Sequence, residues 1–238
     1  VTVVALLAGL EREQGQTATA RAAAPATSYV DIARHPEFMR LAPMGFVLYG
    51  GLVAIQALWA GPWLTQVNGW SAASAGLGLL MINAAMLVAF FAWGVVMPML
   101  QRRGVGGHRL LRQGVPVGLL LLAAIAWAGS AASALAWTAW CVATSVLAVS
   151  QPLVGQAFPV RMAGRALSAF NLVIFGGIFL LQWGIGAVID GLRASGLGTE
   201  DAFRSAMAML CLLGTASYLW YLRVPGADVH NGGSEPRT

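Results

Sequence analysis

The chain has 238 residues, of which 58% are hydrophobic and 10% are charged, and its formal net charge is +5. Soluble domains usually carry about 25% charged residues, so this composition excludes an ordinary soluble globular domain. All fourteen basic residues are Arg, and they gather between the apolar segments. This placement is typical of membrane-protein loops and argues against nucleic-acid binding.

Four uncharged tracts set the number of membrane spans. Asp, Glu, Lys and Arg are absent from residues 41–101, 113–160, 166–189 and 205–222. A helix needs about 20 apolar residues to cross a hydrocarbon core about 30 Å thick. The first two tracts are each long enough for two helices, and the last two for one each. The sequence therefore predicts an all-α, polytopic membrane protein with a six-transmembrane-helix bundle.

In chain order, residues 1–10 are apolar, but a helix of this length extends only about 15 Å. They indicate the end of a helix that begins before Val1. Residues 11–40 are predicted to form a polar linker that contains a short surface helix from Tyr29 to Arg34. Spans are predicted over residues 41–66, 71–100, 110–128, 133–158, 165–190 and 199–222, and residues 223–238 form a polar tail.

The loops alternate in charge. Arg occurs in the linker, after the second and fourth spans and, as Arg223, after the last span, but is absent after the first and third. The loop after the fifth span mixes Arg193 and Arg204 with acidic residues. By the positive-inside rule, the linker and the tail are cytoplasmic. We expect a bacterial-type inner membrane, with the lipid bilayer as the chain's surroundings.

The first span carries a polar and aromatic stripe. Tyr49, Gln56, Trp59, Trp63 and Gln66 follow one another at spacings typical of one helix face. An unpaired amide in hydrocarbon costs several kcal/mol, so the stripe is expected to face protein or water. One interpretation is a substrate-lining face. The alternative is interhelical contact with an interfacial aromatic belt, which suits Trp63 and Gln66 better.

Other spans carry amides at similar depth. The fifth span places Asn171, Phe175, Ile178 and Gln182 on one face. In the fourth span, Gln151 ends a stripe in which Thr144 is expected to pack and to bond the carbonyl four residues earlier. The substrate-cavity candidates are Gln56, Trp59, Asn83, Gln151, Asn171 and Gln182. The alternative for each of them is a hydrogen bond between neighbouring helices.

Several chemistries find no support in the sequence. The segment from Gly104 to His108 resembles a phosphate cradle, but it lacks a Lys and a preceding strand, so a tight turn is expected. No metal-ligand spacing and no catalytic dyad appears, and Cys141 and Cys211 lie in apolar spans as packing residues. We therefore expect no metal, no cofactor and no enzymatic activity.

Two loops carry a family resemblance. The loop after the second span reads Gly94-Val-Val-Met-Pro-Met-Leu-Gln-Arg-Arg-Gly104 and continues to His108-Arg109. The loop after the fourth span reads Phe158-Pro-Val-Arg-Met-Ala-Gly-Arg-Ala-Leu-Ser168. With six spans after a cytoplasmic linker, the chain resembles the C-terminal half, helices seven to twelve, of a major facilitator superfamily transporter. Gln101 occupies the position of an acidic residue in the family motif.

The resemblance implies a secondary transporter, in which two six-helix halves rock around a central site. Helices seven, eight, ten and eleven would line the cavity. The gating loops would contain Arg102, Arg103, Gly104, Arg161 and Arg165. The implied partners are an N-terminal six-helix half, in the same polypeptide or separate, a small-molecule substrate, and protons or another coupling ion. The alternative is a non-transporting fragment, or a structural half-subunit that needs a partner half.

Overall fold

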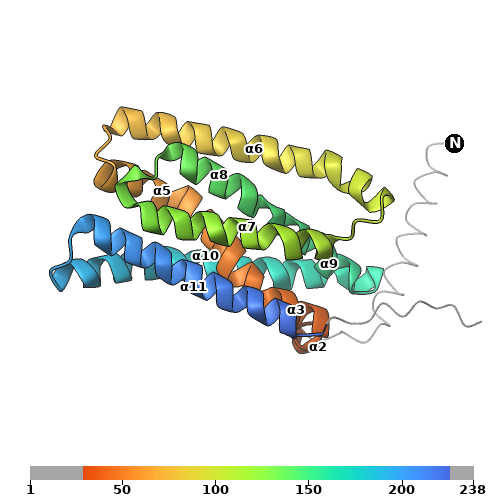
Figure 1. Ribbon diagram of the computed structural model, residues 1–238. Helices are drawn as coiled ribbons and strands as arrows, with labels where there is room; N and C mark the ends of the chain where they lie inside the picture. Colours follow the sequence, from red (N-terminus) through yellow and green to blue (C-terminus); the bar gives the residue numbers. More distant parts are fainter. Residues whose placement is uncertain (1–28, 226–238) are drawn as a thin grey trace, which may run out of the picture.

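The computed structural model describes residues 29–225, and within them the chain is helical with no strand (Figure 1). Six helices are long and apolar enough to cross a membrane. The chain is therefore a multi-pass membrane protein with the predicted all-α six-helix bundle. The helix end predicted at residues 1–10, the linker up to residue 28 and the tail from residue 226 lie outside the described residues.

The helix bounds follow the chain closely. The predicted short helix is α2 (Tyr29–Arg34). The first span joins α3 (Pro36–Met44), η1 (Gly45–Tyr49), α4 (Gly50–Ala54), η2 (Ile55–Trp59), α5 (Ala60–Pro62) and η3 (Trp63–Val67). The second is α6 (Ala72–Arg102), and the third is α7 (Gly107–Ala128) with η4 (Gly129–Ala131). The fourth joins α8 (Ala134–Thr144), η5 (Ser145–Val149) and α9 (Ser150–Gln156). The fifth is α10 (Val160–Ala194), and the sixth is α11 (Thr199–Arg223).

The first span begins earlier than its uncharged tract. Pro36 occupies the first turn of α3, and the side chain of His35 accepts a hydrogen bond from the backbone N–H of Glu37. A proline in the first turn and a capping side chain both favour a helix start at this point. The helix therefore starts at Pro36, not at residue 41, and it includes the charged residues Glu37 and Arg40.

The six spans form one bundle (Figure 1). In this view α7 and α11 lie in front and pack against each other, while α10 lies behind α11 against η1 and α4. Helix α6 lies along one edge and packs mainly against α8. Only a narrow stripe of α6 is buried, formed by Ala75, Gly78, Ile82 and Met86. Most of its surface is therefore available to lipid or to a partner.

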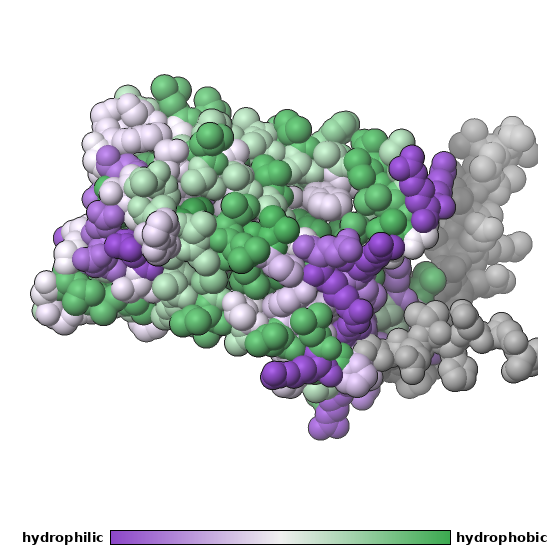
Figure 2. Space-filling model, in the orientation of Figure 1, coloured by the Kyte–Doolittle hydropathy of each residue, from purple (hydrophilic) through white to green (hydrophobic). Residues whose placement is uncertain are grey.

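The two ends of the bundle differ in charge. One end, here termed the linker-side end, carries α2, the α6–α7 turn and the α9–α10 turn. The face in Figure 2 is hydrophobic across its middle and hydrophilic at both ends. Among the described residues, the linker-side end has nine Arg against two acidic residues, Asp31 and Glu37. The opposite end has Arg193 and Arg204 against Asp190, Glu200 and Asp201.

The first and fifth spans touch through their backbones. A Cβ atom added at Gly50 would lie 2.8 Å from the carbonyl carbon of Gly177. A Cβ atom added at Gly177 would collide with the carbonyl oxygen of Phe46. Small residues at such crossings let helices approach closely in membranes, where close packing is a main source of association.

We predict that Gly177→Ala separates α10 from the first span and lowers the free energy of unfolding by about 1–3 kcal/mol, the usual cost of overpacking. Gly184→Ala, on the same helix, is the matched control because a Cβ atom there meets nothing within 4 Å. Unfolding in detergent micelles measures both variants. Equal stability of the two variants would contradict the backbone contact.

Candidate functional site

Polar side chains in the spans pair across helices. The amide of Gln56, on η2 of the first span, donates through Nε2 to Oδ1 of Asn83 on α6, at 3.0 Å. Asn83 also donates through Nδ2 to the carbonyl of Leu79, at 2.8 Å. These bonds satisfy groups that hydrocarbon leaves without a partner. They also fix the rotation of α6 against the first span.

A second amide pair joins the fourth and fifth spans. Nε2 of Gln151, on α9, donates to Oδ1 of Asn171, on α10, at 3.2 Å. Asn171 lies on the exposed flank of α10, next to a buried stripe that includes Phe170 and Ile174. The bond holds these two spans together near the linker-side half of the bundle.

Two tryptophan indoles supply the remaining hydrogen bonds between these four spans. Nε1 of Trp59 donates to the backbone carbonyl of Gln182 at 3.1 Å, which joins the first and fifth spans. Nε1 of Trp93 donates to Oγ of Ser145 at 2.8 Å, which joins the second and fourth. Four spans are thus linked in turn by four hydrogen bonds. We term the eight residues the polar ring: Gln56, Trp59, Asn83, Trp93, Ser145, Gln151, Asn171 and Gln182.

The ring has unused hydrogen-bonding capacity. Asn83 and Asn171 are exposed in the bundle, and Gln56, Gln151 and Gln182 are half-buried. Among the described residues, the side-chain amide of Gln182 has no hydrogen-bond partner, since its bond to Trp59 uses the backbone. An amide has two donor hydrogens and an acceptor oxygen. The ring can therefore bind neutral polar groups of a solute or of water.

The ring itself carries no formal charge. Within residues 29–225, ionisable Asp, Glu, Lys, Arg and His side chains lie at the span ends and in the turns. In the same part of the chain, no group of three His, Cys, Asp or Glu side chains could hold a metal ion. Its chemistry is that of amides, a hydroxyl and indoles, which suits hydrogen bonding and stacking.

All six predicted cavity candidates belong to the ring, but the predicted stripe of the first span does not stay on one face. Trp63 is buried, donates to the carbonyl of Ala132 at 3.1 Å and packs edge-on against Trp137 at 5.2 Å. Gln66 is exposed. The wider π-helical turns η1, η2 and η3 shift the register of an ideal helix. The interhelical interpretation is therefore the correct one for Trp63.

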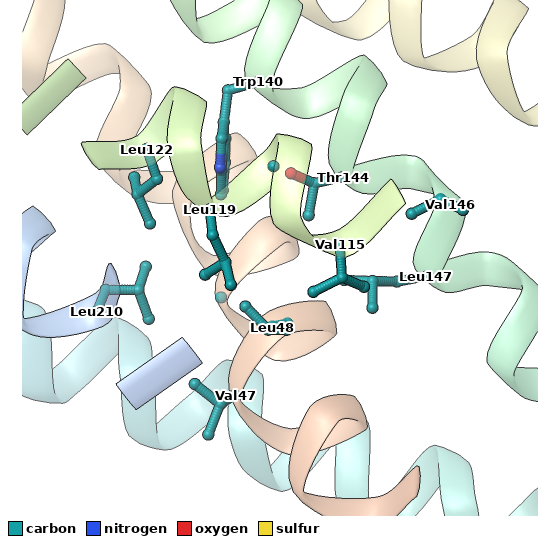
Figure 3. Close-up of a pocket in the computed structure, with 12 residues that line it drawn as sticks. Val47, Leu48, Val115, Leu119, Leu122, Trp140, Thr144, Val146, Leu147 and Leu210 are labelled. Atoms are coloured by element: carbon teal, nitrogen blue, oxygen red, sulfur yellow. The ribbon is translucent and has the colours of Figure 1, made fainter. Parts of the chain in front are cut away.

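The stripe of the fourth span is also rearranged. The expected bond from Thr144 to the carbonyl four residues earlier is wrong, because its hydroxyl oxygen is buried without a hydrogen-bond partner. The helix tightens into a 3₁₀ turn from Ser145 to Val149, directly after Thr144. Thr144 lies beside an apolar cavity of about 10 Å³ with Trp140 and Leu147 (Figure 3). A cavity of this size is close to the minimum for a single water, so it is not a solute site.

Two ring residues were not predicted from the sequence. Trp93 and Ser145 lie on different helices, and no spacing rule within one helix pairs them. Ser145 begins the 3₁₀ turn that breaks the predicted stripe. A buried indole N–H needs an acceptor, which is the only sequence signal that Trp93 offers.

The gating-loop candidates lie away from the ring, at the linker-side end. Arg102 ends α6, and Gly104 reverses the chain with φ +75° while its N–H bonds the carbonyl of Gln101 at 3.0 Å. The predicted tight turn is therefore present. Arg103 follows Arg102 in the turn, and Arg161 and Arg165 lie in the first turns of α10; all four Arg are exposed.

No protein-family model matches the chain, and no curated protein is similar enough to it to count as a relative. The polar ring is therefore the main support for a function.

We predict that Trp93→Phe and Ser145→Ala each weaken the contact between the second and fourth spans. Interhelical hydrogen bonds in membranes contribute about 0.6 kcal/mol on average and up to about 1.7 kcal/mol. A double-mutant cycle measured by unfolding in detergent should give a coupling in this range. Trp183→Phe is the control, because this indole is exposed on α10. Additive effects of the two substitutions would show that the bond contributes nothing.

Proposed function

We propose that the chain forms one six-helix half of a secondary transporter of the major facilitator type, which moves a small solute by alternating access. The observation that carries this proposal is the polar ring with its exposed amides. Its four spans correspond to helices seven, eight, ten and eleven of the family that the sequence resembles. A bilayer alone is a poor environment for these amides.

The exposed amides favour a water-filled cavity against a partner half. Asn83 lies on α6, the second span, and Asn171 on α10, the fifth. The first and fourth spans lie between these two helices in the ring and are hydrogen-bonded to both of them. A second six-helix half opposite this face would enclose the ring and leave room for a solute. Rocking of the halves would open the ring to each side of the membrane in turn.

The geometry indicates how the ring would bind a solute. The Gln182 amide is uncommitted and lies on the helix that receives the Trp59 hydrogen bond. A hydroxyl or amide of the solute would bond to Gln182, and an apolar part of the solute would pack on the indole of Trp59. Neutral hydrogen bonds suit an uncharged or weakly polar group better than a full charge.

The proposal assigns the remaining functions elsewhere. A coupling acid for protons or another ion would come from the N-terminal half, in the same polypeptide or as a separate subunit. The membrane would be a bacterial-type inner membrane, with the linker and the tail in the cytoplasm. The nine Arg at the linker-side end support this orientation.

We predict that thiols introduced on the ring face react with water-soluble reagents, although they lie within the membrane. The test uses single variants Asn83→Cys and Asn171→Cys of the intact protein in liposomes, after Cys141→Ala and Cys211→Ala. Only the thiolate reacts, and thiolates form in water and not in hydrocarbon. Labelling by a charged methanethiosulfonate should therefore be at least about tenfold faster than at a lipid-facing site.

The matched controls lie on the same helices. Val88 on α6 and Leu172 on α10 are apolar and 68% and 73% exposed, and each points well away from the helix face that carries the asparagine. Val88→Cys and Leu172→Cys should label slowly. Equal rates at all four positions would contradict a water-filled cavity on the ring face. Labelling from one side of the membrane only, in every condition, would contradict alternating access.

We also predict that Gln182→Ala lowers the transport rate of the intact protein at least about tenfold, since a lost hydrogen bond to solute costs about 1.5 kcal/mol. Its stability should be unchanged, because the side chain has no protein partner among the described residues. Gln56→Ala should lower both transport and stability, since it removes the bond to Asn83. Uptake or efflux by proteoliposomes measures the rate. Unchanged transport at normal expression would exclude these residues from the site.

A further inference from the structure

A second polar cluster lies away from the ring, where the first span begins. Glu37 is only 5% exposed, although it carries a carboxyl group. Its Oε2 lies 3.7 Å from the Arg40 guanidinium, one turn along α3. Its Oε1 has no hydrogen-bond partner in the described part of the chain. A buried carboxylate oxygen without a hydrogen-bond donor is costly, so this oxygen is expected to gain a donor or to bind a proton.

An imidazole lies beside that oxygen, within ion-pair distance but outside hydrogen-bond geometry. Nε2 of His108, at the start of α7, lies 3.3 Å from Oε1 of Glu37. The other ring nitrogen, Nδ1, lies 3.0 Å from the hydroxyl of Tyr221, near the end of α11. The same hydroxyl is 3.3 Å from the backbone carbonyl of His108. The carboxyl, imidazole and phenol groups therefore connect three spans, α3 to α7 and α7 to α11.

The hydrogens available to the Glu37, His108 and Tyr221 side chains can be counted. The phenol has one hydrogen, and the backbone carbonyl of His108 can only accept. When Tyr221 donates to that carbonyl, its oxygen accepts from Nδ1–H of His108. A neutral imidazole then presents a lone pair at Nε2 to the carboxylate of Glu37, and the two acceptors repel. One additional proton, on Nε2 or on the carboxyl group, removes this repulsion.

The other neutral tautomer makes one hydrogen bond fewer than the protonated imidazole. A neutral imidazole with its hydrogen on Nε2 donates to Glu37, and Tyr221 then donates to Nδ1. The single phenol hydrogen no longer reaches the carbonyl of His108, which keeps its helical bond from the N–H of Arg112. The hydroxyl lies between Nδ1 and the carbonyl, a position that suits both the protonated imidazole and the neutral Nδ1–H tautomer. Because the acid and the imidazole are coupled, the proton belongs to the pair and not to either residue.

Water has a route to the pair. A cavity of about 580 Å³ opens at the linker-side end beside the α6–α7 turn. Its lining includes Glu37 and His108 together with the amides Gln101 and Gln156. No other residue of the lining carries an ionisable side chain. The His108 side chain is 39% exposed, so it connects the buried carboxyl to this cavity.

Fixed charges surround the pair on each packed element. The positive charges of Arg40 on α3 and Arg112 on α7 disfavour a positive charge on His108. On α11, Tyr218 lies beside Tyr221, and the Arg40 guanidinium stacks 4.5 Å above the Tyr221 ring. Arg40 also donates through Nε to the backbone carbonyl of Tyr221 at 3.0 Å. Arg40 thus balances the carboxylate and holds α3 to α11 in either protonation state.

We propose that Glu37 and His108 form a binding site for one proton, which enters from the linker-side water through this cavity. The bound proton joins α3 to α7 through Oε1 and Nε2, and it lets Tyr221 on α11 bond both Nδ1 and the carbonyl of His108. Loss of the proton removes one bond among these three spans. The site lies outside the polar ring, so the inference does not depend on the transport proposal.

The experiment follows the protonation of His108 directly. The full chain, labelled with ¹⁵N-histidine, is placed in lipid nanodiscs and titrated with acid while the imidazole signals are recorded by NMR. His108→Asn identifies the signal of His108. In Glu37→Gln, the proton affinity of His108 should fall at least tenfold. Asp190→Asn, which removes an exposed carboxyl at the opposite end, should leave that affinity unchanged.

A second variant keeps the test valid where Glu37→Gln fails to fold. Tyr221→Phe removes only the hydroxyl and keeps both the ring beneath Arg40 and the backbone carbonyl that Arg40 bonds. It should lower the proton affinity of His108 at least threefold. A change of less than twofold in Glu37→Gln, or in Tyr221→Phe when that variant alone folds, would overturn the proposal. So would an equal change in Asp190→Asn.

Discussion

Hydrocarbon offers no hydrogen bonds, so a polar side chain in a membrane span needs a partner within the protein or in water that enters it. This constraint explains the arrangement of four of the six spans. Gln56 meets Asn83, Gln151 meets Asn171, Trp93 meets Ser145, and Trp59 meets a backbone carbonyl. Each bond permits only a small range of helix rotations. Apolar packing alone would not distinguish these rotations, because leucine contacts lipid and protein about equally well.

The ends of the bundle are held by the last span. At the end opposite the linker side, Glu200 accepts from the N–H of Ser130 at 2.7 Å, and Arg204 donates to the carbonyls that end α7. At the linker-side end, Trp220 donates to the carbonyl of Met39, and Tyr221 accepts from Arg40. The bonded carbonyls of α7 and of Tyr221 are left over at helix ends, and that of Met39 is left over because Pro43 has no N–H. Helix α11 thus braces the third span at one end and the first at the other, and leaves the ring face unobstructed.

The sequence was sufficient for the spans and for most of the ring. Uncharged tracts long enough to cross a bilayer predicted six helices. An amide within such a tract predicts a polar contact, because an unpaired amide in hydrocarbon is costly. Pairing was not accessible, since Gln56 and Asn83 meet through the tertiary arrangement and not through a spacing rule. The π-helical turns of the first span and the 3₁₀ turn after Thr144 changed which residues share a face.

The cluster around Glu37 was missed for a different reason. A charged residue beside an apolar tract reads as a loop or linker residue, and the predicted span accordingly began at residue 41. Pro36 and the capping side chain of His35 start the helix earlier and bring Glu37 and Arg40 into the bundle. Their charges are tolerated because each has a partner on another span or one turn away.

Glu37 lies far from the ring residues of its own span. Glu37 and Gln56 are 19 residues apart on one continuous helical span, or about 28 Å at 1.5 Å per residue. In the proposed transporter, a proton at Glu37 therefore cannot touch a solute bound at Gln56 or Trp59, and it would affect that solute through the packing of the first span. That span carries both Glu37 and two ring residues, so its tilt is common to the two sites. If this tilt couples the two sites, linkage makes the coupling reciprocal. The factor by which proton binding changes the affinity for the solute equals the factor by which solute binding changes the affinity for the proton.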